Sequence, residues 1–231
     1  QEAMELIIDI GTNGEIILGN KDRLISASCA TGPAFEGAQL RFGMRAAPGA
    51  IEKIAIDKET KEVRFKVIDE SRWNTEMKPE EIKAKGICGS GIIDALPQLF
   101  LAGVIDKSGR FNKTLEHPRL RFSGDQFEYV IAWAHETSIG QDVVVCQDDI
   151  RAIQLGKSAM YAGSRILMET LGIEKVDKVI LAGAFGSYID KISAAVLGMF
   201  PDCDPQNVYS VGNAAGDGAR MALLNVDKRR E

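Results

Sequence analysis

A carboxylate followed by a turn between two glycines stands at the start of the chain. Asp9 lies in the apolar run 6–10, and Gly11, Thr12, Asn13 and Gly14 follow it. The glycines let backbone N–H groups approach an anion, and the Thr12 hydroxyl is a further donor for a phosphate oxygen. A carboxylate beside such a turn can hold hydrated Mg²⁺ or orient an attacking water. Asp9 is therefore the candidate catalytic residue and metal ligand, and the four turn residues are candidate phosphate contacts.

A plain hairpin turn is the alternative interpretation of these residues. Asn13-Gly14 is by itself a common hairpin signal and needs no ligand to explain it. The position of Asp9 favours the functional interpretation, because an unpaired carboxylate in an otherwise apolar strand is costly to bury.

Two other glycine-rich segments follow apolar runs near the end of the sequence. The first is Gly183, Ala184, Phe185 and Gly186, whose small residues leave room for a flat ligand such as a nucleotide base and ribose. A tight turn between a strand and a helix is the alternative. The second segment, 212–216, contains Asn213, which we keep as a candidate ligand-binding residue. Its alanines and glycines favour close helix packing more than ligand binding.

The segment 86–91, Gly-Ile-Cys-Gly-Ser-Gly, could form an anion-binding nest at the start of a helix. It lacks the lysine and the spacing of a Walker loop. A Cys88 nucleophile would need a nearby base, yet both histidines, His117 and His135, fall in an irregular region and are expected at the surface. Cys–His catalysis and a zinc site are therefore disfavoured.

Composition excludes several other classes of protein. The 231 residues are 45% hydrophobic and 26% charged with a net charge of −5, which is typical of a globular domain. No run of five like charges marks a nucleic-acid-binding surface, and no apolar stretch approaches the roughly 20 residues of a membrane span. The four cysteines lack Cys-x-x-Cys pairing, which indicates a reducing compartment and buried thiols. With no signal-peptide pattern at the start, we expect a cytoplasmic protein without nucleic-acid or membrane partners.

The first half of the sequence predicts strands followed by one helix and more strands. Strands are expected over 6–10, 15–19 and 24–29 as an antiparallel meander, then a helix from Pro33 to near Gly43. Strands over 51–56 and 63–68 follow, and Ser90 is placed to cap a helix over 92–102. Residues 103–147 read as an irregular insertion containing a hairpin at 120–122 and 127–132.

The second half alternates between helices and strands. Its longest helical pattern covers 147–171, with Gly156 and Gly163 on a stripe that would let the helix lie close to a sheet. A strand over 178–182, a helical turn over 193–197, a strand over 207–211 and a helix over 214–224 follow. This alternation predicts an α/β fold, with ligand contacts at the carboxyl ends of the strands.

The order of these elements, with Asp-x-Gly-Thr in the first hairpin, resembles one half of the acetate and sugar kinase, actin and heat-shock chaperone superfamily. Proteins of that superfamily have two related halves, bind ATP between them and carry one Asp-x-Gly loop in each. Only one such loop is present here. The resemblance implies that residues 1–231 are the second half of a two-half actin-like ATPase domain of ribonuclease H-like fold. Its mixed sheet would be flanked by helices and carry the 103–147 insertion, and the chain would be a fragment of a longer protein.

A closer resemblance is carried jointly by five segments. Residues 6–16, 30–38, 45–51, 86–91 and 181–186 look like those of the reductive activators of corrinoid proteins. That family uses ATP to return an inactive Co(II) corrinoid protein to Co(I) for methyl transfer. By resemblance, Asp9 to Gly14 is the second phosphate loop and Gly183 to Gly186 the adenosine motif.

The same resemblance implies cofactors and partners. The cofactors are ATP or ADP with Mg²⁺, and an iron–sulfur cluster in an upstream domain that these residues do not contain. The partners are a corrinoid protein and the upstream half of the ATPase domain, with a homodimer as a further alternative. The intact protein is then an ATP-hydrolysing enzyme and the isolated half is inactive. Two other functions stay open, namely a small-molecule kinase of the superfamily and a non-catalytic scaffold that responds to nucleotide.

Overall fold

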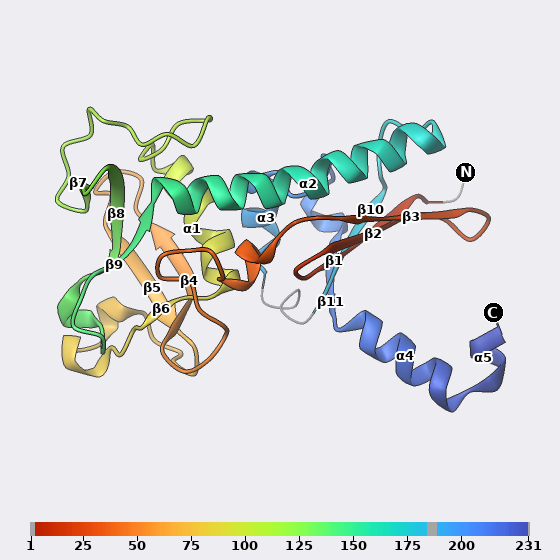
Figure 1. Cartoon of the computed structure of the whole chain (residues 1–231), viewed down its shortest axis with the longest axis horizontal. Helices are drawn as coiled ribbons and strands as arrows, with labels where there is room; N and C mark the ends of the chain where they lie inside the picture. The colour runs from red at the N-terminus through yellow and green to blue at the C-terminus, as the bar shows by residue number, and fades with distance from the viewer. Residues whose placement is uncertain (1–2, 184–188, 231) are drawn as a thin grey trace. The chain divides into compact units, whose positions relative to one another are not determined.

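The chain divides into two compact units, which are described separately here. The computed structural model describes residues 3–183 and 189–230. One unit combines the N-terminal residues up to Thr31 with the residues from Ser158 onward, and the other is Gly32–Lys157. Figure 1 labels the helices and strands in chain order.

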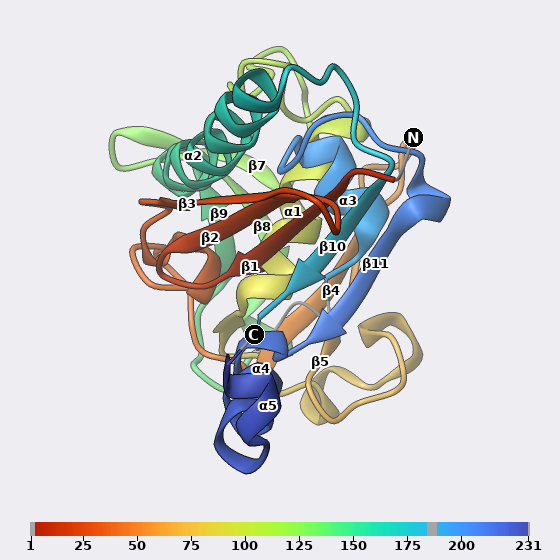
Figure 2. The ribbon, with the colours of Figure 1, turned by 90° about the vertical axis from the view of Figure 1, so that its right-hand side faces the viewer.

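The first unit is built on a five-stranded mixed sheet with the order β11-β10-β1-β2-β3. Strands β1, β2 and β3 form the predicted antiparallel meander, and β1, β10 and β11 run parallel to one another (Figure 2). The strands are β1 (Glu5–Ile10), β2 (Gly14–Gly19), β3 (Leu24–Cys29), β10 (Lys178–Ala182) and β11 (Val208–Gly212). The predicted mixed α/β sheet is confirmed.

Helix α2 (Gln147–Leu171) covers one face of this sheet with its C-terminal part. A Cβ at Gly163 would lie 2.4 Å from Sγ of Cys29 and 2.8 Å from Cδ1 of Ile16. The missing side chain therefore allows the close approach that the sequence predicted. Strand β1 alternates in burial, with Leu6 and Ile8 fully buried and Ile7 on the opposite, partly open face.

Residues 189–230 add four short elements to this unit: α3 (Lys191–Leu197), η6 (Pro205–Asn207), α4 (Ala214–Leu224) and α5 (Val226–Arg230). Helix α3 begins two residues before the predicted helical turn, because the Asp190 side chain accepts a hydrogen bond from Ser193 N at 2.8 Å and caps it. Helix α4 has the predicted bounds, and none of its residues is buried.

The second unit contains two three-stranded sheets. One has the order β5-β4-β6 and the other the order β7-β8-β9. Helix α1 (Gly89–Leu101) packs on β4, and a Cβ at Gly91 would lie 2.3 Å from the carbonyl oxygen of Ile51. The strands are β4 (Ala50–Ile56), β5 (Val63–Val67), β6 (Gly86–Ile87), β7 (Leu120–Ser123), β8 (Gln126–Ala132) and β9 (Val143–Cys146). Short 3₁₀ turns are η1 (Pro33–Glu36), η2 (Asn74–Glu76), η3 (Pro79–Glu81) and η4 (Ala134–Glu136). The segment 103–147 lies within this unit, which also holds β4, β5 and α1.

A buried carboxylate ties strands of the second unit to a loop. Glu128 on β8 is 2% exposed and pairs with Arg41 at 2.7 Å and with Arg121 at 2.8 Å. Arg121 also contacts Asp142 at 2.7 Å. The two guanidinium groups supply the charged partners that a buried carboxylate requires.

Three local predictions for this unit are wrong. The helix expected from Pro33 to Gly43 is a single 3₁₀ turn, because Gly37 and Gln39 both have positive φ and end it. Helix α1 begins at Gly89, so Ser90 lies inside it, and Cys88 holds the N-cap position without a side-chain hydrogen bond that caps the helix. His117 is largely buried, since its ring stacks on Tyr129 and its Nε2 lies 3.6 Å from Glu62.

Candidate functional site

The parallel strands of the first unit bring three predicted segments to one edge of the sheet. Asp9 on β1 is opposite Ala182 on β10, which is opposite Gly212 on β11. Because parallel strands end on the same side, the turn after β1, Gly183 after β10 and Asn213 after β11 share the carboxyl edge. Strand β11 has a register shift there, with Val211 as the extra residue.

Gly183 lies directly against Asp9. Its φ is +107°, and a Cβ built on it would be 2.9 Å from Oδ1 of Asp9 and 2.6 Å from the carbonyl oxygen of Ile10. Its N–H donates to the carbonyl oxygen of Gly212 at 2.9 Å. Glycine is therefore required by both backbone conformation and contact, and this one residue joins the ends of β1, β10 and β11.

The Asp9 carboxyl group is in a setting that disfavours its charge. Burial raises the pKa of Asp9, and the nearby Glu15 carboxylate raises it further. Glu15 is the residue opposite Asp9 on β2, so the two side chains share one face of the sheet. A cation between or beside two carboxylates would relieve this repulsion, which is the electrostatic condition for a divalent metal site.

The turn after β1 is held from behind by Thr31. Its hydroxyl, in a residue only 5% exposed, donates to the carbonyl oxygen of Thr12 at 2.9 Å and lies 3.2 Å from that of Gly11. The Gly11 N–H donates within the turn to Asn13 at 3.1 Å. Thr12 and Asn13 are exposed. The turn thus has a fixed base and an accessible tip.

Gly14 and Asn213 lie at the same edge, and each has a structural role there. A Cβ at Gly14 would lie 3.0 Å from Cγ2 of Thr31 and 3.1 Å from Cγ of Met160, so the turn is pressed against α2. Oδ1 of Asn213 accepts a hydrogen bond from Gly216 N at 3.0 Å and caps α4. Asn213 therefore starts the last long helix at the edge where Asp9 lies.

Most of the predicted site residues are brought together at this edge: Asp9, Gly11, Thr12, Asn13, Gly14, Gly183 and Asn213. Ala184, Phe185 and Gly186 fall outside the described residues. Sequence reasoning about the site missed Thr31 and Glu15. Glu15 follows the turn directly, so its position in the sequence could have indicated it. Thr31 lies between Ala30 and Gly32, and the only signal for it was this run of small residues.

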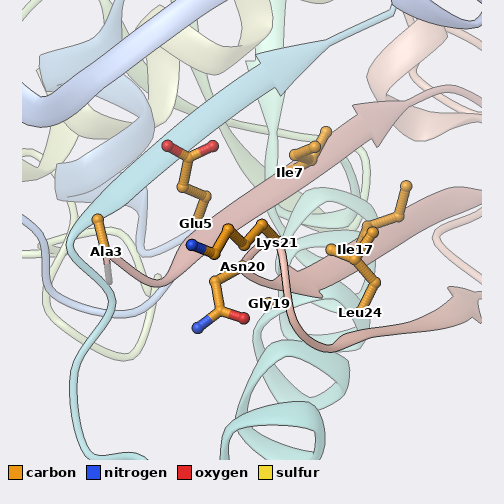
Figure 3. Close-up of a pocket in the computed structure, with 8 residues that line it drawn as sticks. All are labelled: Ala3, Glu5, Ile7, Ile17, Gly19, Asn20, Lys21 and Leu24. Atoms are coloured by element: carbon orange, nitrogen blue, oxygen red, sulfur yellow. The ribbon is translucent and has the colours of Figure 1, made fainter. Parts of the chain in front are cut away.

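The hollow drawn in Figure 3 belongs to the other end of the same sheet. It has a volume of about 480 Å³ and is lined by Glu5, Ile7, Ile17, Gly19 and Leu24, together with Ala3, Asn20 and Lys21. Glu5, Gly19 and Leu24 are register partners at the start of β1, whereas Asp9 is near its end. The hollow is therefore separate from the edge that carries Asp9.

A Cys88 nucleophile and a zinc site were also weighed from the sequence. Cys88 is buried and its Sγ lies 3.4 Å from both the Ile51 carbonyl oxygen and Oγ of Ser90. No cluster of three metal-ligating His, Cys, Asp or Glu side chains occurs within 3–183 and 189–230. Over the same residues, none of the helices combines the length and apolar character needed to cross a membrane.

The fold and the edge site define the class of protein. A five-stranded mixed sheet with an antiparallel meander, two parallel strands and an Asp-x-Gly turn at the carboxyl edge is the actin-like, or ASKHA, nucleotide-binding fold. Residues 3–231 match the family described as the C-terminal domain of RACo, the ASKHA domain. The chain belongs to that family, and the predicted actin-like fold and resemblance to corrinoid activators are confirmed.

Relatives of known description agree with this assignment. The chain is 42% identical over 234 residues to the corrinoid activation enzyme RamQ of Eubacterium limosum, covering 97% of this chain and 37% of RamQ. It is 29% identical over 237 residues to a Methanosarcina barkeri protein described as Co(II) methylated amine-specific corrinoid protein reductase, covering 97% and 39%. A solved structure of a reductive activator for corrinoid, iron–sulfur protein is similar with a TM-score of 0.87 and 39% identity, covering 100% and 35%. The chain thus spans less than two fifths of the length of each.

Proposed function

We propose that residues 1–231 are the nucleotide-binding C-terminal part of an ATP-dependent activator that returns a Co(II) corrinoid protein to the Co(I) state. The observation that carries the proposal is the convergence of Asp9, the Gly11–Gly14 turn and Gly183 at one edge of the sheet. Relatives described as a corrinoid activation enzyme and a corrinoid protein reductase support the choice of corrinoid. The proposed location is the cytoplasm.

The residues at the edge suit a magnesium nucleotide by the chemistry of their donor groups. Asp9 provides a carboxylate oxygen, which Mg²⁺ prefers, and the exposed residue Thr12 follows in the turn after β1. When bound, the magnesium nucleotide would supply a phosphoanhydride bond whose cleavage drives a change of state. Asp9 would hold the metal or its water, the turn would contact phosphate oxygens, and Gly183 would keep side-chain bulk away from Asp9.

Nucleotide is proposed to act through two states of the complex with the corrinoid protein. Co(II) to Co(I) reduction adds one electron to cobalt and is uphill for a biological donor. An activator can help only if it binds the readily reduced form of the corrinoid protein more tightly than the resting form. Thr31 fixes the base of the phosphate turn, and Asn213 starts α4 at the same edge. Nucleotide bound at this edge would therefore contact or displace both the turn after β1 and the start of α4.

The electron itself is proposed to come from elsewhere in a longer protein. We infer an iron–sulfur cluster in an upstream domain, because the four cysteines here are far apart and three of them are buried. The other phosphate loop would come from the upstream half of the ATPase domain. These 231 residues alone are then expected to bind nucleotide weakly and to hydrolyse it negligibly, since half of the charge-stabilising groups are missing.

The test measures corrinoid reduction and ATP hydrolysis by the full-length protein together. With a low-potential electron donor, a Co(II) corrinoid protein and ATP, the Co(I) absorption band should appear only when all three are present. Hydrolysis should rise when the corrinoid protein is added. Stimulation by a sugar or a small acid instead would favour a kinase, and ATP binding without hydrolysis under any of these conditions would favour a scaffold.

A further inference from the structure

The second unit contains a hollow whose lining is rich in charged and polar side chains, and which we call the guanidinium hollow. Its volume is about 320 Å³. Strands β7, β8 and β9, labelled in Figure 1, contribute to its wall together with the loop that carries residues 41–42. The charged and polar lining residues are Arg41, Arg121, Ser123, Glu128, Gln141 and Asp142. All of them belong to Gly32–Lys157, whereas the edge that carries Asp9 belongs to the first unit.

The four charged side chains of the hollow lie at two depths. The carboxylates of Glu128 and Asp142 are 2% and 18% exposed, and the side chains of Arg41 and Arg121 are 49% and 41% exposed. The negative charges therefore lie beneath the positive ones. Although two charges of each sign are present, an ion that arrives from solvent meets the guanidinium groups first. The local field at the mouth of the hollow favours an anion.

Every carboxylate oxygen in the hollow already accepts a hydrogen bond. Oε1 and Oε2 of Glu128 accept from Arg121 at 2.8 Å and from Arg41 at 2.7 Å. The two oxygens of Asp142 accept from Arg121 and from the Ala134 N–H, both at 2.7 Å. Within the described part of the chain, Nη2 of Arg41 and Nη2 of Arg121 donate to no partner. The groups left over are donors, so a ligand that fits must supply acceptors.

The guanidinium group of Arg41 is held in place from several sides. Glu128 accepts from its Nη1, and the Arg41 backbone N–H donates to Oδ1 of Asp149 at 2.8 Å. Its Cζ lies 5.7 Å from the centre of the Phe42 ring. An arginine usually loses rotamer freedom when it binds a ligand, and this loss is smaller where the fold already fixes the side chain. The planar guanidinium fork matches the paired oxygens of a carboxylate or a phosphate.

We propose that the guanidinium hollow binds an oxyanion, supplied as a carboxylate or a phosphate group. Nη2 of Arg41 and Nη2 of Arg121 donate to its oxygens, and the Ser123 hydroxyl and Gln141 amide are further donors in the lining. The two sources of such a group are a free phosphate ion and an acidic side chain of the corrinoid protein. The oxyanion site does not depend on the proposed function, and only the second source makes use of it.

Arginine modification on the full-length protein tests the site. Phenylglyoxal reacts with accessible guanidinium groups, and mass spectrometry of the peptides gives a rate for each arginine. Inorganic phosphate replaces chloride at constant ionic strength, so that screening is unchanged. Modification of Arg41 and Arg121 should slow about tenfold when phosphate is at about ten times its dissociation constant, by mass action. Arg72 is the internal control, because its side chain is 48% exposed and also pairs with a glutamate. Its rate should not change.

Lysine variants separate the guanidinium fork from its charge. Arg41→Lys keeps the positive charge and removes the planar pair of N–H groups, so phosphate should protect Arg121 about tenfold less tightly. Arg72→Lys is the matched control and should leave the protection of Arg121 as in the wild type. Equal protection of Arg41 and Arg72 in the wild-type protein would overturn the site, as would full protection of Arg121 in Arg41→Lys. If Arg41→Lys does not fold, the wild-type comparison decides alone.

A second measurement identifies the source of the oxyanion. The wild-type protein is modified in the presence of Co(II) corrinoid protein without phosphate, and an unrelated acidic protein serves as the control. Slower modification of Arg41 with the corrinoid protein alone would assign the ligand to a carboxylate of that partner. Protection by phosphate but not by the corrinoid protein would assign it to a free anion. Absence of protection by both would refute the site. Corrinoid reduction is measured separately, so an active protein without protection refutes the hollow alone, and protection by phosphate without reduction refutes the function alone.

Discussion

Oδ1 of Asp9 lies 2.9 Å from the point where a Cβ on Gly183 would stand, although 174 positions separate the two residues in sequence. The same Cβ would be 2.6 Å from the carbonyl oxygen of Ile10. The Asp9 carboxylate can therefore occupy its position only because the residue after β10 is a glycine. Geometry at the candidate site and stability of the sheet edge are linked through this pair.

Gly183→Ala should destabilise the protein and disturb the site together. The methyl group must displace the backbone of β1 or Asp9, and alanine is also strained at φ +107°. We expect a loss of about 2–4 kcal/mol in the free energy of unfolding, from overpacking and strain combined. Urea denaturation followed by circular dichroism measures it.

Gly140→Ala is the matched control for backbone strain. Gly140 has φ +69° but nothing within 4 Å of a built Cβ. It should cost only the left-handed backbone penalty of about 1–2 kcal/mol. If both variants lose the same free energy, contact with Asp9 and Ile10 contributes nothing to the effect.

Asp9→Asn should strongly reduce the proposed ATP hydrolysis without weakening the fold. The variant keeps the shape of the side chain and removes the charge that burial and Glu15 disfavour. Metal-dependent ATP hydrolysis by the full-length protein should fall about 10²-fold or more, the scale of a lost charge-stabilising group. Unfolding of the variant would instead make Asp9 a structural residue, and normal hydrolysis would remove it from the mechanism.

The pH dependence of stability supplies an independent check on Asp9. Its pKa is raised in the folded state, so the folded protein binds the proton more tightly than the unfolded chain. The stabilisation from this site is complete below the ordinary aspartate pKa and is lost as pH rises through the raised value. Asp9→Asn should therefore flatten the stability profile over that interval and be neutral or stabilising at pH 7. A profile unchanged by the substitution would show that the Asp9 pKa is ordinary.

Thr31→Val should loosen the turn after β1. Valine preserves the shape but removes the hydroxyl that donates to the Thr12 carbonyl oxygen and lies near that of Gly11. The expected loss is about 1–3 kcal/mol for buried groups left without their partner, and nucleotide affinity should weaken in the full-length protein. Thr31→Ser retains the hydroxyl and should recover most of the affinity. Normal affinity with Thr31→Val and reduced affinity with Thr31→Ser would show that the Thr31 methyl group packed beside Gly14, and not the hydroxyl, holds the turn.

The elements of the first unit were predictable because their signals are local. Alternating burial in β1, the Asn13-Gly14 turn and the long helical pattern of α2 each follow from neighbouring residues. The alternation of strand, helix and strand after residue 177 was also local, and β10 and β11 pair in parallel with α3 between them. Recognition of the joint motifs added the family, which no single turn could specify.

The second unit was harder to predict because its structure depends on distant residues. The run 143–146 forms β9 only by pairing with β8. The helix expected after Pro33 ends at Gly37, whose φ is +81° and where a Cβ would lie 2.6 Å from the carbonyl oxygen of the more distant Met44. The burial of His117 needs Tyr129 and Glu62, which are far from it in sequence. Thr31 was missed for the same reason, as its partners lie across β2 and β3.

The buried carboxylate of Glu128 offers a prediction for the second unit. Glu128→Gln leaves Arg41 and Arg121 without their shared anionic partner and places an amide where a 2% exposed carboxylate had been. The substitution removes the buried charge itself and the two guanidinium groups are about half exposed, so the cost is that of weaker hydrogen bonds, about 1–3 kcal/mol. Chemical denaturation of the variant should show a lower midpoint with an unchanged slope.

Glu70→Gln is the control for Glu128→Gln, because it removes a carboxylate from a surface ion pair. Glu70 forms a surface pair with Arg72 at 2.8 Å, and hydrogen bonds from Arg72 lower the Glu70 pKa to about 2. Because water screens such a pair, its removal should leave the denaturation midpoint almost unchanged. If Glu128→Gln is equally mild, the guanidinium groups of Arg41 and Arg121, both about half exposed, are satisfied by solvent. The buried carboxylate would then hold β8 in place by packing rather than by charge.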